Sequence, residues 1–321
     1  MDLFNLESPL ATERFEAKTQ PPIQNGPPML AEAFRAAGFD VVSLANNHMF
    51  DQMREGVTET VDAVTAAGLM PVGAGSSQDE AKKPLVVERG GARIAFLAWT
   101  MALNRNLLDD DKDEPWVMKW SEDWARKAVS SAREDADLVV VAMHWGSEFG
   151  LPVAVHEKDA ARALCAAGAD LIIGSGPHVL QPVSWVKDAA SGRKCLVAYS
   201  LGNVLSNQGL KYRFGWKPPD LVQAKNVPYT RDGLFLRVTM QGKEDGTVEV
   251  AGVEGVPLWT ENNWVLRYEE KPPPPDRIWI QPILPLLETL ADPKDLHRKL
   301  LEERLAIIEE MVGDVVSYVG I

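Results

Sequence analysis

Apolar residues along the chain fall into two patterns that predict different elements. Continuous apolar runs, typical of strands buried on both faces, predict strands over 41–44, 138–143, 171–173 and 196–201. Apolar residues three and four apart predict helices over about 29–37, 55–67, 124–135 and 157–167. Antiparallel strands are predicted for a hairpin over 85–99, around Gly90-Gly91, and for 233–240 and 247–253. The sequence therefore predicts an α/β fold with mixed sheets.

Each continuous apolar run ends at a group of polar or aromatic residues. In chain order these are Asn46, Asn47, His48 and Asp51, then His144 and Trp145, then His178, and finally Asn203. Ligand sites in α/β sheets lie beyond the carboxyl ends of the strands. We therefore expect these side chains to meet at one edge of the fold.

Histidine placement favours a metal-centred site at that edge. Three of the five histidines, His48, His144 and His178, follow strand ends, and Asn47 and Glu7 lie beside them in the pattern. A single histidine there is usually a hydrogen-bonded structural residue, whereas three at equivalent positions favour metal binding. Imidazole, carboxylate and amide oxygen donors together suit Mn, Zn or Fe.

Length, composition and charge exclude several classes of protein. The 321 residues are 45% hydrophobic and 25% charged, which suits a globular protein with a large core. A net charge of -13 offers no basic face for nucleic acid or an anionic membrane. No stretch has the roughly 18 apolar residues of a membrane span, and the first residues lack a signal-peptide pattern. We expect a cytoplasmic protein that binds a small-molecule or polymer substrate.

The C-terminal part of the chain has a different composition. The prolines within residues 271–275 predict an extended, semi-rigid linker. Beyond it, residues 283–290 and 296–311 predict amphipathic helices. We therefore predict a domain over 1–270, a linker over 271–275 and a helical extension over 276–321. The extension either folds back on the domain or forms a homodimer contact.

Five segments, in order, resemble a known family. They are Asn5-Leu6-Glu7-Ser8-Pro9, Ser43-Leu44-Ala45-Asn46-Asn47-His48, His144-Trp145-Gly146, Gly174-x-x-Pro177-His178 and Tyr199-Ser200-Leu201-Gly202-Asn203. With these, residues 2 to about 260 resemble the CapA family of capsule and poly-γ-glutamate biosynthesis proteins. That family is part of the calcineurin-like metallophosphoesterase superfamily. The resemblance implies two mixed β-sheets packed as a sandwich, flanked by helices, with metal bound at the strand ends.

The resemblance also implies residue roles. Glu7, Asn47, His144 and His178 would bind one or two divalent ions, and His48 would be the catalytic acid or an orienting histidine beside them. We predict that Asp51 orients His48, with capping of the next helix as the alternative. Substrate contacts are predicted for Asn46, Trp145 and Asn203, and a turn role is the alternative for Asn203.

The chain departs from the family pattern in two places. The usual first strand, which ends in Gly-Asp and supplies a metal ligand, is missing before Met1, and Gly176 stands where the family has a histidine. Three explanations stay open: a true short form that is inactive or binds one metal, a start assigned too late with the missing strand encoded upstream, or replacement of the ligand by His156 or Glu148.

Two functions are consistent with this sequence. The first is a metal-dependent hydrolase of the phosphoesterase type in capsule or poly-γ-glutamate-like polymer metabolism, with metal-activated water as nucleophile. The alternative is a catalytically degenerate CapA-like subunit that binds polymer or a partner protein. No stretch of the sequence identifies the substrate.

Overall fold

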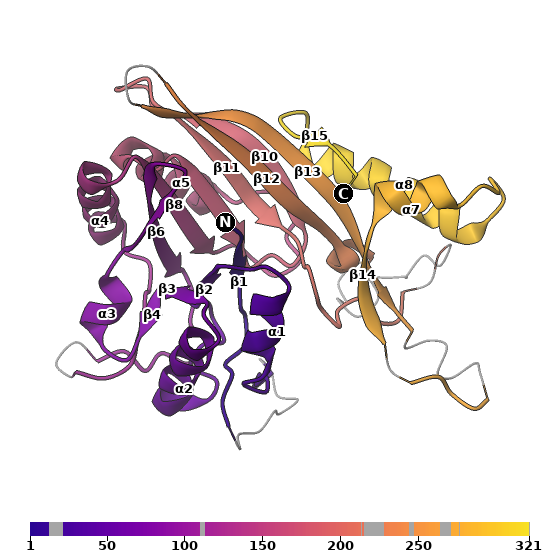
Figure 1. Ribbon diagram of the computed structural model, residues 1–321, viewed down its shortest axis with the longest axis horizontal. Helices are drawn as coiled ribbons and strands as arrows, with labels where there is room; N and C mark the ends of the chain where they lie inside the picture. The colour runs from indigo at the N-terminus through magenta and orange to yellow at the C-terminus, as the bar shows by residue number, and fades with distance from the viewer. Residues whose placement is uncertain are drawn as a thin grey trace. The chain divides into compact units, whose positions relative to one another are not determined.

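Figure 1 shows the computed structural model of the chain as two compact units. Residues 1–12, 22–109, 113–212, 214, 228–243, 247–263, 271–275 and 277–320 are described. The first unit contains Met1–Trp145, His156–Ser175 and Val186–Cys195. The second contains Gly146–Val155, Gly176–Trp185 and Leu196–Ile321.

One sheet of the first unit is short and parallel. Its order is β1 (Leu3–Asn5), β2 (Val41–Ser43) and β3 (Met70–Val72), with helices α1 (Leu30–Ala36) and α2 (Met53–Ala66) between successive strands. Phe4 of β1 packs its ring 4.8 Å from Phe34 and 4.6 Å from Phe39, between ring centroids. These contacts anchor α1 to the sheet. Helix α1 and strand β2 confirm the helix predicted over 29–37 and the strand predicted over 41–44.

A second sheet of the first unit is mixed. The strands of this six-stranded sheet that lie wholly within the first unit follow the order β9 (Leu171–Ser175), β8 (Leu138–His144), β6 (Ala92–Thr100) and β5 (Leu85–Arg89). Strands β6, β8 and β9 are parallel, whereas β5 and β6 form the predicted hairpin. Gly90 and Gly91 both have positive φ (60° and 81°), which the two-residue turn requires. All seven residues of β8 are buried, which explains its continuous apolar run.

The remaining elements of the first unit are helical or very short. Helices α4 (Glu122–Asp135) and α5 (Val155–Ala167) confirm two predicted helices. Three elements were not predicted: β4 (Ala74–Gly75), α3 (Gln78–Lys82) and β7 (Trp116–Val117). Strands β1 and β2, and strands β6, β8 and β9, run parallel within their sheets. Their carboxyl ends are therefore where side chains from distant parts of the sequence can meet.

The second unit is built around long antiparallel strands. Strand β12 (Asp232–Gly242) pairs with β13 (Val248–Asn262), which also pairs with β14 (Ile278–Pro282) and, in parallel, with β15 (Ser317–Tyr318). A 3-10 turn, η2 (Pro228–Arg231), precedes β12. The division between the units falls within β10 (Leu180–Lys187) and β11 (Lys194–Leu201).

The proline-rich segment lies inside the second unit rather than between two domains. Asn262 of β13 opposes Ile278 of β14, so residues 263–277 connect two paired strands. The Asn263 Nδ2 donates a hydrogen bond to the Pro275 carbonyl (2.8 Å), which holds part of that connection in place. The structure thus differs from the predicted boundary at 271–275, because β14 adds a strand to the preceding sheet.

Both predicted C-terminal helices are present and fold back on the same unit. They are α7 (Ile283–Thr289) and α8 (Leu296–Val312). The guanidinium of Arg304 in α8 forms a buried bidentate pair with the carboxylate of Asp232 in β12. This pair ties the last helix to the central strands of the unit.

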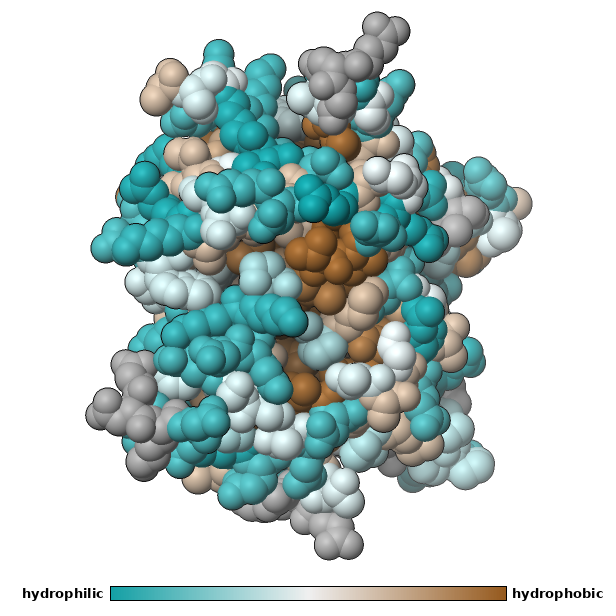
Figure 2. All heavy atoms as spheres, turned by 60° about the vertical axis from the view of Figure 1, so that its left-hand side comes forward, coloured by the Kyte–Doolittle hydropathy of each residue, from teal (hydrophilic) through white to brown (hydrophobic). Residues whose placement is uncertain are grey.

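The molecular surface reflects the charged composition. The face drawn in Figure 2 is mostly hydrophilic, with hydrophobic residues gathered in a smaller area. Among the described residues, no helix combines the length and the apolar character that crossing a membrane requires.

Candidate functional site

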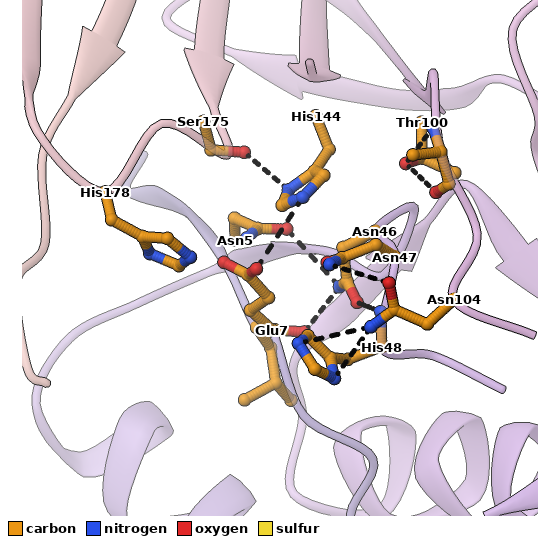
Figure 3. Close-up of polar contacts among 12 residues, drawn as sticks. Asn5, Glu7, Asn46, Asn47, His48, Thr100, Asn104, His144, Ser175 and His178 are labelled. Atoms are coloured by element: carbon orange, nitrogen blue, oxygen red, sulfur yellow. Dashed lines mark hydrogen bonds and ion pairs between the residues drawn. The ribbon is translucent and has the colours of Figure 1, made fainter. Parts of the chain in front are cut away.

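Polar side chains in the first unit gather where four strands end (Figure 3). Glu7 follows β1, Asn47 and His48 follow β2, Asn104 follows β6, and His144 is the last residue of β8. We call the set Glu7, Asn46, Asn47, His48, Asp51, Asn104 and His144 the strand-end cluster. The structure therefore brings together most of the residues that the sequence placed beyond strand ends.

Asn46 connects two of these strand ends. Its Nδ2 donates to the Leu6 carbonyl (2.7 Å), and its Oδ1 accepts a hydrogen bond from the His48 backbone N–H (3.2 Å). The residue is 0% exposed. Asn46 thus fixes the loop that carries His48 against the exit of β1, and it lies beneath the site rather than on a surface that a substrate reaches.

His48 and Asp51 form a buried acid–base pair. The Nδ1 of His48 lies 2.6 Å from Oδ2 of Asp51, and the two residues are 6% and 4% exposed. The same carboxylate oxygen accepts a hydrogen bond from the Gln24 backbone N–H (2.7 Å). A carboxylate at Nδ1 keeps the proton on that nitrogen and leaves Nε2 as the atom that can exchange a proton with a ligand.

This geometry decides between the two roles considered for Asp51. Helix α2 begins after an N-cap at Gln52 and has no side-chain cap hydrogen bond. The Asp51 carboxylate is instead engaged by the His48 ring and the Gln24 backbone. Asp51 therefore orients His48 and does not cap the helix.

Asn104 is a member of the cluster that sequence reasoning missed. Its Nδ2 lies 3.3 Å from Nδ1 and 3.4 Å from Nε2 of His48. A single atom at nearly equal distance from both ring nitrogens cannot lie in the ring plane without colliding with the carbon between them. The amide therefore covers the face of the imidazole. The Asn104 backbone N–H also donates to the Asn47 carbonyl (2.9 Å).

Glu7, Asn47 and His144 supply a donor set that suits a divalent metal ion. The Nε2 of His144 lies 3.6 Å from Oε1 of Glu7, and its Nδ1 lies 3.3 Å from the Ser175 hydroxyl oxygen. Atoms about 2.0–2.2 Å from a zinc ion can bind it together at such a separation. The Oδ1 of Asn47 is buried without a hydrogen-bond partner. A buried amide oxygen in that condition is unfavourable unless a ligand meets it.

The site nevertheless offers few carboxylate and imidazole ligands for a metal ion. Across the described ranges, no group of three or more His, Cys, Asp or Glu side chains is placed to hold a metal ion. A metal ion bound by Glu7 and His144 would therefore need the amide oxygen of Asn47 as a third ligand. Glu148 and His156, considered as replacement ligands, are both exposed.

Trp145 belongs to the interior of the first unit. It is 2% exposed, and its backbone N–H donates to the Ser175 carbonyl (2.9 Å), which extends the pairing of β8 with β9. The structure thus places the Trp145 indole in the core and not where the predicted substrate contact would need it. A residue that follows the end of a buried strand can still face inward.

The second unit brings His178 and Asn203 together. The Nδ1 of His178 lies 3.1 Å from Oδ1 of Asn203, whose Nδ2 donates to the Thr230 carbonyl (2.9 Å). Gly202 precedes Asn203 with φ of 67°, and a Cβ there would lie 2.4 Å from the Asp232 carbonyl oxygen. Only glycine permits this close approach of two backbones, which sets the position of Asn203.

These observations define an α/β protein whose strand ends carry an acid–base pair beside a mixed carboxylate, amide and imidazole donor set. The chain belongs to the family described as bacterial capsule synthesis protein PGA_cap, which matches residues 1–208. This result confirms the resemblance to CapA proteins. The α/β organisation with mixed sheets confirms the predicted fold class and is consistent with the calcineurin-like fold.

Two named relatives illustrate the similarity. The "Capsule biosynthesis protein CapA" of Bacillus anthracis is 36% identical over 182 residues, covering 56% of this chain and 43% of that protein. The "PGA biosynthesis protein CapA" of Bacillus subtilis (strain 168) is 32% identical over 214 residues, covering 61% of this chain and 54% of that protein. The chain thus spans about half the length of the curated relatives that it matches.

Similarity to solved structures is weaker. The NAD nucleotidase of Haemophilus influenzae has a TM-score of 0.45 and 10% sequence identity, covering 91% of this chain and 50% of that chain. A similarity at this level supports no conclusion about function.

Proposed function

We propose that this chain is a metal-dependent hydrolase of the phosphoesterase type that acts in capsule or poly-γ-glutamate-like polymer metabolism. The observation that carries the proposal is the buried His48–Asp51 pair beside the donors Glu7, Asn47 and His144. Membership of the PGA_cap family and the names of the two CapA relatives support the link to polymer metabolism.

Each residue of the strand-end cluster has a role in this proposal. Glu7, Asn47 and His144 would hold a divalent ion, with Mn, Zn or Fe as candidates. His178, also predicted as a metal ligand, lies in the second unit and is considered by itself below. When bound, such an ion polarises a phosphoryl group and lowers the pKa of a water molecule. The chain's own contribution is to orient these donors and to supply a proton.

His48 is the residue that moves the proton. With Asp51 at Nδ1, a proton at Nε2 can pass to the leaving oxygen of the substrate, and the carboxylate balances the charge of the imidazolium beforehand. Asn104 covers the ring face and limits its rotation. Asn46 holds the backbone of the loop, so the pair is positioned before substrate binds.

Hydrolysis of diphenyl phosphate, whose phenolate leaving group benefits from protonation, by the full chain with Mn²⁺ tests this proposal. General acid catalysis contributes about 10²–10⁴-fold, so we expect His48→Gln to lower kcat by that range. His297→Gln is the matched control, because His297 lies in the second unit and pairs with Glu261. Equal activity of wild type and His48→Gln would contradict the proposed role of His48.

The second candidate function is a non-catalytic subunit that binds polymer or a partner protein. It is favoured by the small number of charged ligands, since the described parts of the chain contain no group of three or more His, Cys, Asp or Glu side chains placed to hold a metal ion. Complementation of capsule formation in cells separates the two functions. Full complementation by His48→Gln would favour the binding subunit, and loss of complementation would favour the hydrolase.

A further inference from the structure

His178 lies in a strained and tightly held loop of the second unit. Its φ is 59°, and Phe149, which stacks on it, has φ of 63°. The two ring centroids are 6.0 Å apart with 29° between the planes, and the Phe149 N–H donates to the Pro177 carbonyl (2.8 Å). Non-glycine residues seldom adopt positive φ, and such strain persists where the surrounding structure enforces it. The loop thus fixes the position of one imidazole ring.

The hydrogen bonds of Asn203 fix which end of its amide faces that ring. Three oxygen atoms surround Nδ2: the Thr230 carbonyl at 2.9 Å, Gln208 Oε1 at 3.0 Å and the His178 carbonyl at 3.3 Å. Side-chain amide orientation is assigned from such a network, and only the NH₂ group can satisfy these acceptors. The Oδ1 must therefore face Nδ1 of His178, at 3.1 Å.

An amide oxygen only accepts hydrogen bonds, so Nδ1 of His178 has to donate. The neutral imidazole then carries its proton on Nδ1 and its lone pair on Nε2. A histidine that binds metal through one nitrogen usually donates the N–H of the other to an oxygen, which fixes the tautomer and the ring orientation. The contact between His178 and Asn203 has this form.

We propose that Asn203 is a positioning residue that holds His178 in the Nδ1–H tautomer, so that Nε2 can bind a divalent metal ion. This replaces the substrate contact predicted for Asn203. The metal-binding part of the inference rests on the proposed function, whereas the tautomer depends only on the second unit. Phe149 supports the same outcome by holding the ring face.

Nitrogen NMR of the full chain, labelled with ¹⁵N-histidine and kept metal-free at alkaline pH, tests the tautomer directly. Loss of one signal set in His178→Gln assigns the ring. We expect a protonated, pyrrole-like Nδ1 and a pyridine-like Nε2 in wild type. Asn203→Asp should keep this pattern, because a carboxylate also accepts from Nδ1, whereas Asn203→Leu should move the proton toward Nε2.

Asn262→Leu is the control, because Asn262 donates an exposed hydrogen bond to Asn207 and should leave the tautomer unchanged. A wild-type spectrum with the proton on Nε2 would overturn the inference, whatever the metal affinity. If Asn203→Leu fails to fold, the spectra of wild type and Asn203→Asp still decide the question.

A titration with Zn²⁺, followed on the same His178 signals, tests the metal step. Removal of a hydrogen-bond partner behind a ligating histidine typically weakens metal binding about 10–100-fold, and we expect that loss in Asn203→Leu. We expect Asn203→Asp to keep wild-type affinity or exceed it. A wild-type Nδ1–H tautomer with no response to Zn²⁺ would contradict the metal role in the proposed function and leave the tautomer assignment intact.

Discussion

The two units each contain a cluster of buried polar side chains, and the two clusters are built differently. In the second unit, Asp232, Arg304, Arg231, Glu261 and His297 form what we call the ion-pair cluster. Arg304 pairs with Asp232, and Glu261 accepts from Arg231 (3.0 Å) and lies 2.8 Å from His297 Nε2. Arg231 also lies over the Trp259 ring, 4.2 Å from its centroid. Every charge in this cluster has an opposite charge beside it.

The strand-end cluster of the first unit contains mainly amides and imidazoles. Its Asn47 Oδ1 is buried without a hydrogen-bond partner, and its Glu7 and His144 are 3.6 Å apart. Polar groups that are fully paired with one another stabilise the contacts between elements and offer no vacant hydrogen-bonding atom to a ligand. A buried acceptor without a hydrogen-bond partner instead lowers stability unless a ligand binds to it. The comparison favours a structural role for the ion-pair cluster and supports the proposal that the strand-end cluster binds a ligand.

The largest effect that we expect comes from breaking the ion-pair cluster. Removal of one partner of a buried pair costs about 3–5 kcal/mol, so Arg304→Leu should lower the free energy of unfolding by that amount. Arg237→Leu is the matched control, because Arg237 pairs with Glu254 on an exposed part of β12 and should cost at most about 1 kcal/mol. Urea unfolding measures both. Similar losses in the two variants would remove the contrast between buried and exposed pairs.

The effect of Arg304→Leu should depend on pH. Burial raises the pKa of Asp232 to about 6, and Arg304 opposes that rise. Without Arg304 the folded-state pKa rises further above the unfolded value of about 3.9. Between about pH 4 and the folded-state pKa, Asp232 is ionised in the unfolded chain but still protonated in the folded protein. Raising the pH in this range therefore stabilises the unfolded state relative to the folded state. We expect a larger loss of stability at pH 7 than at pH 5, and an equal loss at both would contradict this role of Asp232.

Within the strand-end cluster, Asp51→Asn should act on activity more than on stability. An asparagine cannot balance the charge of a His48 imidazolium. We therefore expect kcat to fall about 10²-fold, which corresponds to about 2.7 kcal/mol. Hydrolysis of diphenyl phosphate and urea unfolding, measured side by side, separate the two quantities. Loss of stability with unchanged kcat would place Asp51 in a structural role, as in the ion-pair cluster.

Asn47→Leu should show the opposite sign of stability change from Arg304→Leu. Removing a buried acceptor that lacks a partner relieves its desolvation, so we expect metal-free protein to be unchanged or more stable by about 1 kcal/mol. Loss of the amide ligand should weaken Mn²⁺ or Zn²⁺ binding. Calorimetric titration measures the affinity. A large loss of stability with unchanged metal affinity would make Asn47 structural.

The smallest effect on activity that we expect is that of Asn104→Ala. Its amide covers the His48 ring but accepts or transfers no proton in the proposed chemistry. We expect about a tenfold fall in kcat, roughly 1.4 kcal/mol, with KM unchanged. Steady-state kinetics measures kcat and KM separately. A rise in KM alone would instead make Asn104 a substrate-binding residue.

The sequence predicted elements best where one periodicity continued long enough. Strand β8 and helix α5 were found because a continuous apolar run and a helical repeat each extend over several residues. Strand β10 was missed because Gln181 and Pro182 interrupt its apolar residues. Strand β14 was missed because it follows the prolines that suggested a linker, and its pairing with β13 depends on tertiary contacts.

Site residues were predictable in position more than in role. His48, Asp51 and His144 lie where the strand ends placed them. Asn46 and Trp145 fit the same pattern yet are buried, because the direction of a side chain just beyond a strand depends on the loop that follows. Asn104 was missed because it lies four positions beyond Thr100, the last residue of β6, where sequence periodicity gives no information.

Metal content per chain is the measurement that tests the strand-end cluster most directly. The 321-residue chain, purified without chelator and supplied with Mn²⁺ and Zn²⁺, would be compared by elemental analysis with His144→Ala and with the control His297→Gln. We expect at least one ion per chain in wild type and in the control, and a clear loss in His144→Ala. Wild-type protein without bound metal would contradict the proposal that this cluster is a metal centre.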